Sequence, residues 1–183
     1  MSGLTLARLR RIARAASGRE RRLTFVTGED GRRWAAWPYG CVELDDQRHG
    51  WLDRPADGCY RMRADGLALV ECGPAFNPHL VRQEMLPLLT AAGRVNVVPT
   101  RWMFEDGKLT RRLLERFDGQ SAVVDADLWQ LWTAAVGGPV WQVGSRSGWL
   151  VWARAKGEPG VAALGPVHVR TVPIPPEQSA VPA

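Results

Sequence analysis

The chain has 183 residues, of which 45% are hydrophobic and 23% charged, a composition typical of a globular protein with a sizeable core. Its apolar stretches are shorter than the roughly 20 residues that a membrane-spanning helix requires. Four arginines interrupt the apolar residues between Met1 and Ala16, so we expect no signal peptide, no membrane partner and a cytoplasmic location. The net charge of +5 permits a polyanionic partner without requiring one.

The three cysteines and three histidines are too scattered to predict a metal site. No C-x-x-C pair is present, and no histidine pair has the spacing of zinc ligands. We therefore predict three reduced thiols, no bound metal and no cofactor. The residues concerned are Cys41, Cys59, Cys72, His49, His79 and His168.

The first third of the chain predicts one helix followed by antiparallel strands. Apolar residues recur at helical spacing from Leu4 to Ala16, and Ser17-Gly18 can end that helix. Strands are expected at 22–27, 32–37 and 41–44, with a turn at Glu29–Gly31. The polar, turn-rich stretch from Asp45 to Ala64 is either an extra hairpin or a connecting loop.

The middle of the chain repeats the order of strand, helix and strands. A strand is expected at 67–71, and Asn77 and Pro78 are typical of the start of a helix that extends to Ala92. Pro87 should kink that helix or mark a shift of its axis. Strands at 94–98, 101–104 and 108–114 follow, with an Asp-Gly turn at Asp106-Gly107.

The last third shows the same order again. A strand at 121–124 precedes a helix at 125–135, in which Trp129 and Trp132 share an apolar face with Leu128 and should be core. Strands are expected at 140–143, 149–155 and 161–169, and the continuous apolar run Trp149–Trp152 is typical of a strand covered on both sides. The proline-rich stretch 173–183 is expected to be a disordered tail.

These elements predict an α+β, antiparallel-sheet-rich fold with about three β-α-β-β-β units, repeating every 55 to 60 residues or so. The expected division is a first unit at 1–66, including the extra loop or hairpin, and a second and third unit at 67–172.

Several segments resemble the DNA polymerase sliding clamps. The segment Ser121–Arg170 is similar to the second half of a clamp domain: a strand, a D-x-L helix, a glycine break, a strand pair, and a closing strand with the run Leu164–Val169. The helix at 4–16, followed by LTFV, EDGR and RWAAW, resembles the opening half. The resemblance implies a DNA-clamp-like fold in a short clamp, viral or plasmid-borne, and a ring that encircles double-stranded DNA and tethers a DNA polymerase.

The resemblance also implies where partners would bind. Clamp helices contact the DNA backbone without reading bases, which would assign DNA binding to Arg8, Arg11, Arg14 and Arg82. A solvated surface is the alternative for these arginines, and the third helix has no basic residue and begins with Asp125 and Asp127. A partner peptide would lie on the strand with Leu164, Pro166 and Val167. Because rings of this family contain twelve helix-bearing half-units, three per chain imply a homotetramer.

Two other classes of function stay open. The nine tryptophans allow a non-ring protein-binding module, such as a small regulator or inhibitor, although core packing is the simpler explanation for most of them. An enzyme would have to use the acidic residues Asp45, Asp46, Asp53 and Asp57, which are also typical of turns. No nucleotide-binding or nucleophile motif is present, so we predict no catalytic residues and no enzymatic activity.

Overall fold

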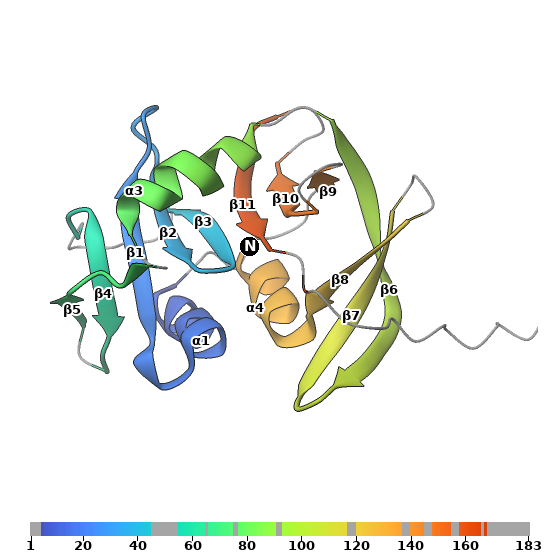
Figure 1. Ribbon diagram of the computed structural model, residues 1–183, viewed down its shortest axis with the longest axis horizontal. Helices are drawn as coiled ribbons and strands as arrows, with labels where there is room; N and C mark the ends of the chain where they lie inside the picture. Colours follow the sequence, from blue (N-terminus) through green and yellow to red (C-terminus); the bar gives the residue numbers. More distant parts are fainter. Residues whose placement is uncertain are drawn as a thin grey trace, which may run out of the picture.

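The computed structural model describes residues 5–44, 55–64, 66–74, 77–90, 93–116, 120–136, 140–144, 148–154, 158–165 and 167. Within them the protein is α+β, as expected, with one large antiparallel sheet of eleven strands (Figure 1). The strands are β1 (Arg22–Thr27), β2 (Arg33–Trp37), β3 (Gly40–Leu44), β4 (Gly58–Met62), β5 (Leu67–Val70), β6 (Arg94–Asp106), β7 (Leu109–Arg116), β8 (Ser121–Asp125), β9 (Val140–Gly144), β10 (Leu150–Ala153) and β11 (Gly160–Leu164).

The strand order contains two equivalent three-strand units, β1-β2-β3 and β9-β10-β11, that meet between β3 and β11. The order is β5-β4-β1-β2-β3-β11-β10-β9-β6-β7-β8. Helix α1 (Leu6–Ser17) precedes β1-β2-β3, and helix α4 (Ala126–Val136) precedes β9-β10-β11 in the same manner. Val42 of β3 pairs with Ala162 of β11, so the sheet is continuous between the two units. Strands β4 and β5, which lie on either side of the predicted boundary at residue 66, are also paired with each other.

Helices cover both faces of this sheet. Alternate residues of the central strands point to opposite faces, and α1 and α4 pack on one face while the helical segment at 78–89 crosses the other (Figure 1). The core under the helix pair contains Leu9, Ile12, Phe25, Trp37, Trp129, Trp152 and Leu164, among others. The core on the opposite face contains Val26, Trp34, Ala36, Cys41, Val81, Met85, Leu89, Val151 and Ala163.

Helix α1 is fixed by its ends and by one apolar face. The Thr5 side chain accepts a hydrogen bond from the Arg8 amide at 3.3 Å, which caps the first turn. Gly18 ends the helix with a φ of 57°, a left-handed value that glycine adopts without a steric penalty. Leu9, Ile12 and Ala13 are completely or almost completely buried, so the opposite side of the helix faces outward.

The segment at 78–89, called the α3 segment below, is helical but irregular. It consists of α3 (Pro78–Leu80), a π-helical turn (Val81–Met85) and a 3-10 turn (Leu86–Leu89). Asn77 caps it as predicted, accepting from the His79 amide at 2.9 Å. Pro87 has no amide hydrogen for a regular helix, which accounts for the change of helix type beside it.

The prediction of three equivalent units needs correction. The α3 segment lies on the sheet face opposite α1 and α4, so two helix-bearing units are equivalent among the described residues. The strands predicted at 94–98 and 101–104 are one strand, β6, with a bulge between Pro99 and Met103. The turn-rich stretch after Asp45 supplies β4, which pairs with β5 in a hairpin. The predicted tail at 173–183 lies outside the described residues.

Candidate functional site

The helix pair is the first candidate for a functional surface. Helices α1 and α4 pack against each other on one face of the sheet. Arg11 and Arg14 are exposed on α1, whereas Arg8 is half-buried. Helix α4 exposes Asp127 and Gln130 and contains no lysine or arginine. The basic character of this surface therefore comes from α1 alone.

Arg82 does not belong to this surface, contrary to the prediction. It lies on the α3 segment, on the other side of the sheet. Its Nε donates to the carbonyl oxygen of Thr27 at 2.9 Å, and its guanidinium forms an ion pair with Asp57. These contacts hold the α3 segment against the end of β1, which is a structural role.

The acidic stretch considered for metal binding does not form a described metal site. Asp57 accepts a hydrogen bond from the Thr27 hydroxyl at 2.9 Å in addition to its ion pair with Arg82. Asp45, Asp46 and Asp53 lie outside the described residues. Within the part of the chain that the structure describes, no three His, Cys, Asp or Glu side chains are grouped as metal ligands would be.

Two of the three residues predicted to bind a partner peptide, Leu164 and Val167, are described by the structure. Leu164 is only 2% exposed and belongs to the core under the helix pair, so its side chain is not available to a peptide. The Val167 amide donates to the carbonyl of Val123 in the edge strand β8 at 3.0 Å. Pro166 lies outside the described residues. The prediction for Leu164 was wrong because its strand is covered on both faces.

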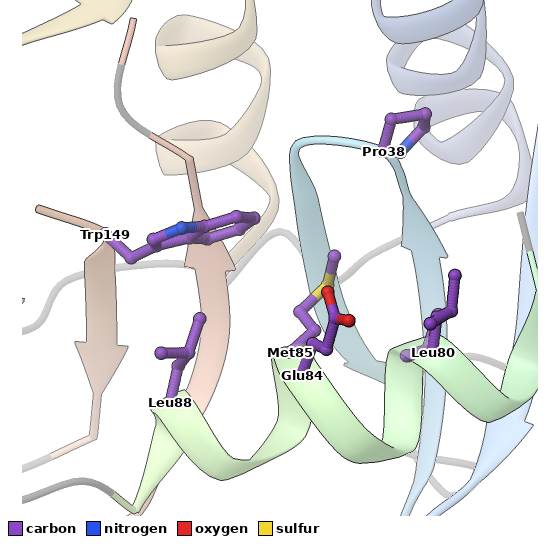
Figure 2. A pocket seen from close by; sticks show the side chains of 7 residues that line it. Pro38, Leu80, Glu84, Met85, Leu88 and Trp149 are labelled. Carbon is purple, nitrogen blue, oxygen red and sulfur yellow. The ribbon is translucent and has the colours of Figure 1, made fainter. Parts of the chain in front are cut away.

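A groove on the α3 side was not predicted from the sequence. It has a volume of about 330 Å³ and is lined by Pro38, Leu80, Val81, Glu84, Met85, Leu88 and Trp149 (Figure 2). Figure 2 shows Trp149 and Leu88 at one end, and Leu80 from the start of the α3 segment at the other. Glu84 is the one charged residue of the lining, so the groove is apolar with a single acidic group.

Most of the tryptophans that the structure describes are core residues. Trp34, Trp37, Trp129 and Trp152 are each 3% exposed or less. This agrees with the prediction that Trp129 is core, and the last three residues of the run at 149–152 are buried as predicted. Trp149 is only half-buried, because it lies at the groove.

Comparison with protein-family models, with curated proteins and with solved structures finds no match for this chain. None of the helices that the structure describes is long and apolar enough to cross a membrane. The geometry described above is therefore the basis for a functional proposal.

Proposed function

We propose that the protein is a sliding-clamp-like processivity factor, a homo-oligomeric ring that encircles double-stranded DNA and tethers a DNA polymerase. One observation carries the proposal: α1 and α4 lie side by side on one face of a continuous antiparallel sheet, and each leads into three antiparallel strands. Together with the sequence resemblance, this arrangement supports one clamp-like domain in which the helix pair faces DNA.

The charges on the helix pair suit contact with a phosphate backbone at one side of the domain. Arg11 and Arg14 are three residues apart and exposed. Exposed arginines attract phosphates without reading base sequence, which is the form of contact that a mobile ring requires. Asp127 near the start of α4 interacts favourably with the helix dipole but repels phosphate. We therefore expect α1 to be the helix that lies closest to DNA.

The number of chains in the ring changes with the corrected repeat count. Three units per chain implied a tetramer, but the structure has two equivalent helix-bearing units. If the ring keeps twelve such units, it contains six chains of 20.3 kDa each. Light scattering on the eluate of a sizing column measures this mass directly. A monomer at every concentration would contradict the ring.

Charge reversal of the outer face of α1 tests the DNA contact. The double variant Arg11→Glu, Arg14→Glu should weaken binding to a short duplex and lower the slope of log affinity against log salt by about 2 per bound chain. The control variant Arg61→Glu, Arg101→Glu changes two exposed arginines on β4 and β6 by the same net charge. Equal salt slopes for the two variants would show that α1 does not face DNA.

The groove favours a second candidate, a non-ring protein-binding module. Its lining matches a short apolar peptide with a basic residue that can lie beside Glu84. The native mass separates the candidates, because this module would remain a monomer or dimer and its DNA affinity would not respond to reversal of Arg11 and Arg14.

A further inference from the structure

Two of the three cysteines share one face of the β4–β5 hairpin. Cys59 in β4 is paired in register with Val70 in β5, and Cys72 follows Val70 by two residues. Because alternate residues of an extended chain point to the same face, the side chain of Cys72 lies on the same face as that of Cys59. Besides burial, a hydrogen bond with the Cys72 side chain is one of the causes that raise the pKa of the Cys59 thiol, which agrees with this placement.

The two thiols differ in their access to solvent. Cys59 is completely buried, with its Sγ 3.6 Å from the Thr24 hydroxyl oxygen, whereas Cys72 is exposed. Burial, and after it the hydrogen bond with Cys72, raises the pKa of the Cys59 thiol to about 12. An oxidant in solution therefore reaches Cys72 first, and Cys59 is protected from direct reaction.

The surroundings of the pair allow a bond to form. Cys72 lies beyond the last paired residue of β5, so its backbone is free of the strand ladder and can adjust to disulfide geometry. The guanidinium of Arg22 partly offsets the pKa shift of Cys59 and lies near Gly73, the neighbour of Cys72.

We propose that Cys59 and Cys72 are a reversible dithiol–disulfide pair in which Cys72 is the entry thiol. With oxidised glutathione as the oxidant, the Cys72 thiolate attacks one glutathione sulfur and releases one reduced glutathione. The Cys59 thiol then loses its proton to solvent, attacks the Cys72 sulfur and releases the second reduced glutathione. Two electrons pass from the cysteine pair to oxidised glutathione. An excess of reduced glutathione reverses both steps.

The bond would join β4 to the chain that leads from β5 towards the α3 segment. The hairpin β4–β5 is at one edge of the sheet, and β5 is the terminal strand among those that the structure describes. The bond would constrain the unfolded hairpin, so the oxidised form should be more stable than the reduced form. This site is separate from the helix pair, and the inference does not depend on the proposed DNA binding.

The test uses the full chain, reduced and freed of reductant, then incubated with oxidised glutathione and analysed by intact mass after alkylation under denaturing conditions. We expect a product two hydrogens lighter than the reduced chain, with one alkylated cysteine and no bound glutathione. Peptide mapping should place the bond between Cys59 and Cys72, because Cys41 is completely buried on the α3 side of the sheet.

Three variants separate the proposed steps. Cys41→Ser should form the same bond and leave no cysteine to alkylate, which is the matched control. Cys59→Ser should stop at a glutathione adduct on Cys72. Cys72→Ser should stay reduced, because the buried Cys59 thiol is then the first that the oxidant would have to reach. A wild-type chain that retains glutathione on Cys72, or that links Cys72 to a second chain instead, would overturn the proposal.

Discussion

The junction between β8 and α4 depends on a small charged network, and its removal is a direct test of the fold. Asp125 is the last residue of β8, and its Oδ1 accepts a hydrogen bond from the Leu128 amide at 3.0 Å, which caps α4. Its Oδ2 accepts from Arg111 Nη1 at 3.1 Å. Arg111 is only 9% exposed, and its second carboxylate partner is Asp106, 3.2 Å from its Nε.

Substitution of Asp125 by alanine removes two contributions to stability. Loss of the helix cap costs about 1 kcal/mol. Loss of one of two carboxylate partners of a mostly buried guanidinium costs about 1–2 kcal/mol, because Asp106 still compensates part of its charge. We therefore expect Asp125→Ala to lower the free energy of unfolding by about 2–3 kcal/mol. For a chain of this length that corresponds to a melting temperature about 5–10 °C lower.

The assay is urea unfolding followed by circular dichroism, with two comparison variants. Asp125→Asn keeps a capping oxygen but loses the charge, so it should cost about 1 kcal/mol. Asp127→Ala removes an exposed acid from the first turn of the same helix and should cost about 0.5 kcal/mol through the helix dipole alone. If Asp125→Ala is no more destabilising than Asp127→Ala, the network does not hold α4 to the sheet.

Two further predictions concern the tight centre of the sheet and the turn before β2. A Cβ added at Gly40 would lie 2.6 Å from Trp37 Cζ2 and 2.8 Å from the backbone oxygen of Ala163, so Gly40→Ala should destabilise by about 1–3 kcal/mol, measured by the urea midpoint. Gly73→Ala is the control and should be close to neutral, because the nearest atom to its added Cβ would be 3.9 Å away. Equal urea midpoints for the two variants would refute the close packing at Gly40. The hydrogen bond from the Arg32 side chain lowers the pKa of Asp30 below its ordinary 3.8. Its contribution to stability is therefore present above that value and is lost as pH falls through the lowered pKa. An NMR titration of Asp30 should show this midpoint, and Arg32→Gln should raise it; no change on substitution would refute the role of Arg32.

Local chemistry made much of the fold predictable from the sequence. Gly18 ends α1, and Asn77 and Pro78 start the α3 segment, because helix-end signals act over a few neighbouring residues. The apolar run at 149–152 indicated two-sided burial, which the structure confirms for Leu150, Val151 and Trp152.

The arrangement of these elements was not predictable in the same way. Val81, Met85 and Leu89 mark one apolar face of the α3 segment, but their spacing does not show which sheet face they cover. Arg82 was therefore assigned to the wrong surface. The groove was missed because its lining comes from three segments, around Pro38, the α3 segment and Trp149, that only tertiary packing brings together.

Burial of the central sheet on both faces limits where this protein can acquire new specificity. Every residue of β10 and β11 is buried, and β2 buries four of its five residues, so a change there alters stability before it alters recognition. Positions open to variation are the outward sides of α1 and α4, the groove side of the α3 segment and the outermost strands. Divergent copies of such a chain would exchange partners by altering these outer layers around an unchanged middle sheet.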